Sequence, residues 1–201
     1  MYPGITAATN PQRPAVIQAE TGEVTTFLEL HEAAIRLSNV LRAAGLQPGD
    51  HVAICMENHS KYFEVIWGCH YAGVVYTACS SRLTKAELTY ILNDCQAKAF
   101  ITSKYKADQA IEISQDIPNV HLRLMIDGTV DGYDSFESTV DSASTLPLPD
   151  MVDGTDMLYS SGTTGMPKGI SRAFPGTPLG TSAGLAAALT VGIYQFHEGM
   201  I

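Results

Sequence analysis

Short apolar runs alternate with stretches of helical periodicity over the first 126 residues. In the helical stretches, apolar side chains recur at steps of three and four residues, as they do on one face of an amphipathic helix. Such an alternation is typical of parallel sheets, because each crossover helix must cover one face of the sheet. The pattern predicts an α/β fold with a mostly parallel, doubly wound sheet and flanking helices. We expect strands at residues 15–18, 51–56, 74–77, 99–102 and 121–126, and helices at about 27–44, 61–72, 84–93 and 105–117.

Two of the expected helices begin with the same local signature. Thr26 stands three residues before Glu29, and Thr84 stands three residues before Glu87. At this spacing the Thr hydroxyl caps a backbone N–H of the first turn, while the Glu carboxylate reaches back to the N–H of the capping residue. Gly45 is expected to end the first of these helices.

The pattern divides the chain into three parts of one partial domain over residues 1–201. Residues 1–126 carry the βα repeats, and residues 127–155 are rich in Ser, Thr, Pro and Asp and are expected to be a loop or linker. Residues 156–201 are expected to carry a strand, a glycine-rich loop and a following helix. The apolar tract 183–196 is interpreted as a core helix, because a membrane span needs about 20 apolar residues.

Composition narrows the possible partners and the compartment. The 201 residues are 45% apolar, and the formal net charge is −9 at pH 7. Nucleic acids and anionic membranes are bound by clustered Lys and Arg, so we expect neither as a partner. No integral membrane segment is expected, because the longest apolar tract is too short. The cysteines show neither CxxC nor Cys–His spacing, which favours buried reduced thiols over zinc or a redox pair. Without a leader-like opening, the sequence predicts a cytoplasmic protein.

A glycine- and hydroxyl-rich run directly follows the strand-like residues 156–158. The run Tyr-Ser-Ser-Gly-Thr-Thr-Gly-Met-Pro-Lys-Gly occupies residues 159–169. Its glycines allow successive backbone N–H groups to converge on one anion, its hydroxyls add donors, and its lysine adds a mobile positive charge. The run therefore predicts a phosphate-binding loop. The candidate binding residues are Ser160, Ser161, Gly162, Thr163, Thr164, Gly165, Lys168 and Gly169.

This loop differs from the Walker A loop. In a Walker A loop the lysine follows the second glycine and is itself followed by Ser or Thr, whereas here Lys168 precedes Gly169. A turn-rich linker of the same composition is the alternative, and the strand before the run argues against it. A different kind of phosphate loop is therefore expected.

Residues 159–169 closely resemble the phosphate-binding motif of the adenylate-forming enzymes, which include acyl-CoA synthetases, firefly luciferases and the adenylation domains of peptide synthetases. The Pro-Gly-Asp turn at 48–50 and the segment Gly-Val-Val-Tyr-Thr at 73–77 are similar to the amino-terminal part of these enzymes, especially of the fatty- and medium-chain acyl-CoA synthetases. The segment 171–179 departs from the Thr-His-x-Asn-like pattern of many members. The resemblance implies an incomplete, amino-terminal portion of the family fold, because the later adenine, magnesium and ribose motifs and the carboxy-terminal domain are missing from the 201 residues.

The resemblance also implies a reaction with two halves. A carboxylate attacks the α-phosphorus of ATP and releases pyrophosphate, and the thiol of CoA then displaces AMP from the acyl-adenylate. ATP, a carboxylic acid and CoA are the implied small-molecule substrates, and the ligands of the implied Mg²⁺ would lie beyond this chain. Within the chain the resemblance assigns no catalytic residue and no metal ligand. It assigns the β- and γ-phosphates to the loop, with Lys168 offsetting negative charge as pyrophosphate leaves.

Two other interpretations remain open. The chain could be a non-catalytic module that binds nucleotides or polyphosphate. It could also be an inactive truncated remnant, which associates with itself through an exposed sheet edge.

Overall fold

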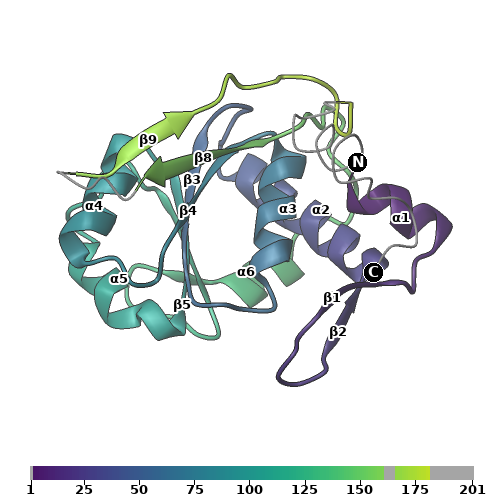
Figure 1. Ribbon diagram of the computed structural model, residues 1–201, viewed down its shortest axis with the longest axis horizontal. Helices are drawn as coiled ribbons and strands as arrows, with labels where there is room; N and C mark the ends of the chain where they lie inside the picture. Colours follow the sequence, from purple (N-terminus) through teal and green to yellow (C-terminus); the bar gives the residue numbers. More distant parts are fainter. Residues whose placement is uncertain (1, 161–165, 182–201) are drawn as a thin grey trace.

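The computed structural model describes residues 2–160 and 166–181 (Figure 1). Its main sheet has seven strands in the order β7-β6-β5-β3-β4-β8-β9. All neighbouring strands are parallel except β9, which is antiparallel to β8. The predicted mostly parallel sheet is confirmed. The strands are β3 (His51–Cys55), β4 (Val75–Cys79), β5 (Ala99–Ser103), β6 (Leu122–Ile126), β7 (Asp134–Ser135), β8 (Thr155–Ser160) and β9 (Lys168–Ser171).

Helices cover both faces of this sheet (Figure 1). On one face lie α2 (Phe27–Ala43), α3 (Tyr62–Ala72) and α6 (Phe136–Asp141), and on the other lie α4 (Lys85–Asp94) and α5 (Ala107–Ile113). Successive strand side chains point to opposite faces. Accordingly Val52 and Ile54 belong to the core beneath α2 and α3, whereas Ala53 and Cys55 belong to the core beneath α4 and α5. The doubly wound architecture follows from this division of the core.

Both predicted capping boxes are present. The backbone N–H groups of Thr26 and Thr84 each donate at 2.8 Å to the carboxylate of the glutamate three residues later. The two threonine hydroxyls in turn accept the backbone N–H groups of Glu29 and Glu87 at 3.3 Å. Gly45 follows α2 with a φ of +90°, a conformation that glycine adopts without a steric penalty. The boundaries of α2 and the start of α4 are therefore set by local sequence.

The first predicted strand is not part of the main sheet. Residues Pro14–Ile17 form β1, which pairs antiparallel with β2 (Val24–Thr26) in a separate two-stranded ribbon that projects from the body (Figure 1). The expectation that this strand opens the parallel sheet was wrong. Only residues 18–23 connect β1 and β2, whereas a parallel crossover needs about a dozen residues or more.

Residues 127–155 are not only a loop. They contain β7 and α6, so the expectation of a structureless linker was wrong over 134–141. The Ser135 hydroxyl caps α6 by accepting the N–H of Ser138 at 3.3 Å, and Phe136 and Val140 are buried. A helix of six residues has no repeating apolar stripe, which is why the polar composition concealed it.

Other differences concern short elements. The helix α1 (Pro3–Thr9) was not predicted, and its start has no side-chain hydrogen bond to a backbone N–H. The helix expected at 105–117 is a 3-10 turn, η1 (Lys104–Lys106), followed by α5, which ends at Ile113. The helix expected at 183–196 lies outside the described residues. No helix within residues 2–160 and 166–181 is both long enough and apolar enough to cross a bilayer.

Three histidines are held in the neutral form by burial. Desolvation lowers the pKa of His31, His51 and His70 below the ordinary value of 6.5. The Nδ1 atom of His31 lies 2.8 Å from the hydroxyl oxygen of Tyr71, which also accepts the backbone N–H of Gly4. Protonation of these imidazoles therefore opposes the folded state.

We expect the free energy of unfolding to fall as the pH drops below about 6.5. In that range the unfolded chain binds more protons than the folded chain, because the folded-state pKa values of the three histidines are lower, so the stabilisation is complete only above the unfolded pKa. The pKa values of Glu29 and Glu87 are lowered from the ordinary value of 4.5. These carboxylates therefore affect the pH dependence of unfolding only in more acidic solution. Urea denaturation between pH 8 and 5 measures the slope. His70→Gln should reduce this slope. A constant urea midpoint from pH 7 to 5 would contradict this expectation.

Candidate functional site

The predicted phosphate loop connects the last two strands of the main sheet. β8 ends at Ser160 and β9 begins at Lys168, and these two residues are partners in the antiparallel ladder. The Ser160 hydroxyl lies 3.5 Å from the carbonyl oxygen of Lys168. The two strands thus fix both ends of the loop. The candidate residues Ser161, Gly162, Thr163, Thr164 and Gly165 lie outside the described residues.

The lysine at the end of the loop is exposed. Within residues 2–160 and 166–181, no carboxylate lies at ion-pair distance from Lys168. The next cation along the chain differs, because Arg172 pairs with Asp156 at 3.5 Å. Within this part of the chain, the ammonium group of Lys168 is therefore available to an anionic ligand.

Gly169 has a role that the sequence did not predict. Its φ is not in the positive range, so the argument from glycine's backbone freedom was wrong at this position. A Cβ on Gly169 would lie 2.4 Å from Cε of Met157 and 3.1 Å from the hydroxyl oxygen of Tyr159. The side chains of the facing strand occupy the space beside the glycine, so a larger residue here would require Met157 and Tyr159 to shift.

The tyrosine opposite Gly169 is hydrogen-bonded to α4. The Tyr159 hydroxyl donates to Oδ2 of Asp94 at 2.5 Å. Burial and this hydrogen bond raise the pKa of Tyr159. The side chain therefore remains a neutral phenol that donates a hydrogen bond. The base of the loop is in this way connected to the helix layer on one face of the sheet.

A polar crevice lies at the carboxyl ends of β3, β4 and β5. It has a volume of about 670 Å³, and its lining includes Glu57, Asn58, Ser80, Ser81, Arg82 and Tyr105. Of the described residues of β8 and β9, none lines this crevice. β8 pairs with β4 only at residues 155 and 156, and Tyr159 then reaches Asp94 at the end of α4, which lies toward the opposite edge of the sheet.

This crevice coincides with a change in the winding of the sheet. The chain leaves β3 through α3 on one face and leaves the adjacent β4 through α4 on the opposite face. Open α/β sheets bind their ligands in such a place, outside the carboxyl ends of the strands. The sequence reasoning missed these residues. The usable signal was polar residues directly after buried strands, as at 57–58 and 80–82.

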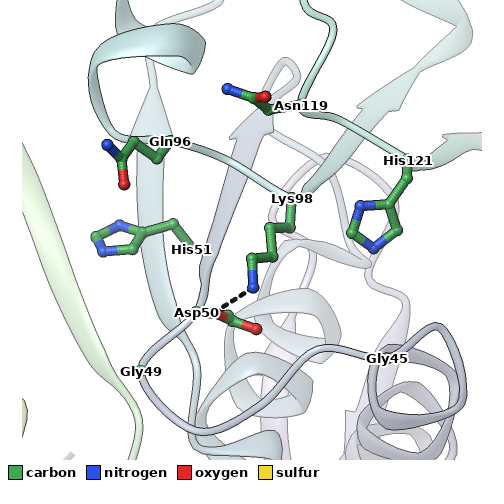
Figure 2. A pocket seen from close by; sticks show the side chains of 8 residues that line it. All are labelled: Gly45, Gly49, Asp50, His51, Gln96, Lys98, Asn119 and His121. Carbon is green, nitrogen blue, oxygen red and sulfur yellow. Dashed lines mark ion pairs between the residues drawn. The ribbon is translucent and has the colours of Figure 1, made fainter.

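A second polar pocket lies at the opposite edge of the sheet (Figure 2). Its volume is about 630 Å³, and its lining includes His51, Lys98 and His121, which stand at or just before the starts of β3, β5 and β6. Nζ of Lys98 lies 2.7 Å from Oδ1 of Asp50 (Figure 2). Burial acts to raise the pKa of Asp50, but the N–H of Gln47 and the Lys98 ammonium lower it on balance. These charges satisfy one another, so this pocket is the weaker candidate.

The cysteines offer no activated nucleophile in either pocket. All four are buried and free, as the sequence predicts. Burial raises the pKa of Cys79, so its thiol stays protonated at neutral pH. Over the described ranges, no group of three or more His, Cys, Asp or Glu side chains is arranged to hold a metal ion.

Comparison with known protein families matches residues 5–174 to the family described as AMP-binding enzyme. The chain is 31% identical over 169 residues to a 2-succinylbenzoate–CoA ligase of Oceanobacillus iheyensis, covering 82% of this chain and 32% of the relative. It is also 31% identical over 168 residues to a long-chain-fatty-acid–CoA ligase of Thermus thermophilus, covering 82% of this chain and 31% of the relative. The chain thus spans about a third of the length of these two relatives.

A solved structure shares the fold. The inhibitor-bound crystal structure of the N-terminal domain of FACL13 from Mycobacterium tuberculosis superimposes with a TM-score of 0.74 at 26% sequence identity. The superposition covers 85% of this chain and 42% of that chain. The fold is therefore one that this known structure also adopts.

Proposed function

The chain belongs to the AMP-binding enzyme family, and from this premise we propose that it supplies the phosphate-binding part of an ATP-dependent acid–CoA ligase. Both relatives named above are CoA ligases. The observation that carries the proposal is the junction of β8 and β9, where an exposed lysine ends a glycine- and hydroxyl-rich loop. Below, "full-length ligase" means the longer protein that this proposal implies.

In the proposed first half-reaction, the carboxylate oxygen of the acid attacks the α-phosphorus of ATP. The bond from that phosphorus to the β-phosphate oxygen breaks, and pyrophosphate leaves with the bonding electron pair. The loop would hold the departing phosphates while the Lys168 ammonium stabilises the negative charge that grows on them. The residues to which we assign this binding are Ser160, Ser161, Gly162, Thr163, Thr164, Gly165, Lys168 and Gly169. Mg²⁺, when bound with ATP, would neutralise further phosphate charge.

In the proposed second half-reaction, the thiol of CoA displaces AMP from the acyl-adenylate. The crevice at residues 57–58 and 80–82 lies at the carboxyl ends of β3 and β4. We therefore place part of a substrate there, following the general rule for open α/β sheets. A fatty acid is the proposed acid, because the Thermus thermophilus relative is a long-chain-fatty-acid–CoA ligase.

Two further assignments belong to this proposal. The cytoplasm is the proposed compartment, since four free buried cysteines are compatible with a reducing environment. Self-association through a sheet edge stays a prediction. Its place would be β9, an edge strand whose four residues are all exposed.

ATP–pyrophosphate exchange by the full-length ligase tests the proposed function. Exchange should depend on added acid, and a panel of fatty and aromatic acids would identify the preferred class. A protein that binds ATP without exchange under every acid would instead be the non-catalytic nucleotide-binding module. A protein with neither binding nor exchange would be the inactive remnant.

For the 201-residue chain alone, we expect pyrophosphate binding without ligase turnover. The loop residues are all within the chain, whereas the chain spans only about a third of its relatives. Calorimetry with inorganic pyrophosphate measures the binding, and Lys168→Ala is the matched control that should weaken it. Pyrophosphate release from ATP with acid and CoA should stay at background. Release that rises in proportion to the purified chain would contradict this expectation.

A further inference from the structure

The end of the β8–β9 hairpin nearest the loop has little support from the rest of the sheet. β8 pairs with β4 only through Val75 with Thr155 and Tyr76 with Asp156. The last four residues of β8, 157–160, pair with β9 alone. The ends of the loop are therefore carried by a two-stranded extension beyond the ladder with β4. An extension of this kind needs another contact to hold one position.

Tyr159 supplies such a contact in this extension. With Met157 it packs against the core beneath α4 and α5. Its hydroxyl donates to Asp94 at 2.5 Å, and the two residues are 65 positions apart in the sequence. Because Tyr159 is directly followed by the first loop residue, Ser160, the hydrogen bond fixes the point at which the loop begins.

The other two residues are arranged to permit this contact. Asp94 is the last residue of α4, where a negative charge is unfavourable because the helix dipole places partial negative charge at that end. Gly169, the ladder partner of Tyr159, leaves the space that the phenol occupies. The Asp94 carboxylate thus accepts the hydrogen bond from Tyr159, and Gly169 leaves room for the phenol ring. We call Asp94, Tyr159 and Gly169 the hairpin anchor.

We propose that Tyr159 and Asp94 are positioning residues of the phosphate loop, acting through the hairpin anchor, and this inference rests on the proposed function. Neither side chain needs to touch ATP. Together they hold the two ends of the loop, Ser160 and Lys168, in one position, so that the donors of the loop meet the departing pyrophosphate. The gain is in orientation, which affects turnover more than the binding of the acid.

A double-mutant cycle in the full-length ligase tests the anchor. Tyr159→Phe and Asp94→Ala should each lower the turnover of ATP–pyrophosphate exchange about 10- to 100-fold, the range expected for misplacement by up to about 1 Å. The KM for the acid should not change. The double variant should be no slower than the slower single variant, because each change removes the same hydrogen bond between Tyr159 and Asp94. Asp94→Asn keeps an oxygen acceptor and should retain most of the activity.

Tyr90→Phe is the matched control. Tyr90 lies one turn before Asp94 on α4, and the Asp94 carboxylate contributes, after desolvation, to raising the pKa of Tyr90. Tyr90 also hydrogen-bonds the Asp94 carboxylate. The variant thus removes a second phenol hydroxyl from the same carboxylate but leaves the bond from Tyr159, and turnover should stay within a few-fold of the wild type. Additive losses in the double variant, or normal turnover in Tyr159→Phe, would overturn the proposal.

Amide hydrogen exchange separates the anchor from the proposed function. Without the Tyr159 hydroxyl, the amides of 157–160 and 168–171 should exchange about tenfold faster, as expected on losing one hydrogen bond of about 1.4 kcal/mol, while those of β3 and β5 should not change. If the wild-type protein shows no pyrophosphate exchange, the proposed function fails, and this measurement still decides on the anchor. Unaltered amide hydrogen exchange over the hairpin in Tyr159→Phe would refute the proposed anchor.

Discussion

Replacing Lys168 by Ala in the full-length ligase should lower the rate of adenylation about 10²–10³-fold, which corresponds to about 2.7–4 kcal/mol, the usual effect of removing one donor to a developing negative charge. The ammonium is exposed and has no carboxylate partner within the described residues, so its charge is free to meet the phosphates. Because water also reaches it, we expect the loss near the lower end of this range. Binding of the acid should change much less, since the lysine is assigned to the departing phosphates.

Arg172→Ala is the matched control for this prediction. Arg172 directly follows β9, four positions beyond Lys168, but it pairs with Asp156. Its removal should leave the rate of pyrophosphate exchange within a few-fold of the wild type. If Lys168→Ala left the exchange unchanged and raised only the apparent KM for the acid, the loop would serve the acid and the assignment would be wrong.

Replacing Phe100 by Ala should lower the free energy of unfolding by about 3–5 kcal/mol, the usual loss for a large buried aromatic side chain. Phe100, the second residue of β5, is 1% exposed, and its ring centroid lies 6.2 Å from that of Tyr133 in an edge-to-face arrangement. The substitution leaves a cavity between the sheet and the helices α4 and α5. Urea denaturation at pH 7.5, above the range in which the histidines titrate, measures the change.

Phe63→Ala is the control of the same residue type. Phe63 lies on α3 and is 48% exposed, so the loss should be about 1 kcal/mol or less, as for most surface substitutions. A loss of the same size at both positions would show that burial does not determine the effect.

The fold was predictable wherever a strand and its helix carry a long repeating pattern. The strands β3 to β6 and the helices α2 to α4 were found because their apolar positions repeat over several turns and because Thr26 and Thr84 mark helix starts. The failures share one cause, which is that pairing partners and short elements are decided by distant contacts. Nothing within residues 15–18 tells that β1 pairs with β2 and not with the main sheet. Similarly, α6 depends on the burial of Phe136 and Val140.

The sequence predicts a chemistry for the candidate site but not its geometry. Residues 159–169 indicate phosphate binding because glycines, hydroxyls and a lysine stand together in the sequence. The contact of Tyr159 with Asp94 could not be predicted, because the two residues meet only after α4 has packed on the sheet. The same holds for Gly169, whose role depends on the side chain opposite it in the ladder. The crevice could not be predicted either, because its residues come together only through the order of the strands in the sheet.

The place of β8 in the sheet has a consequence for the newly made chain. β3 and β4 meet through residues 51 and 75, which are 24 positions apart (75 − 51), whereas β4 meets β8 through residues 75 and 155, which are 80 positions apart (155 − 75). During synthesis from the amino end, β3 to β6 are complete before β8 leaves the ribosome. Until then one edge of β4 has unpaired backbone groups, which are a template for pairing with another chain. The strand that leads to the predicted phosphate loop thus also covers the first two residues of this edge, Val75 and Tyr76.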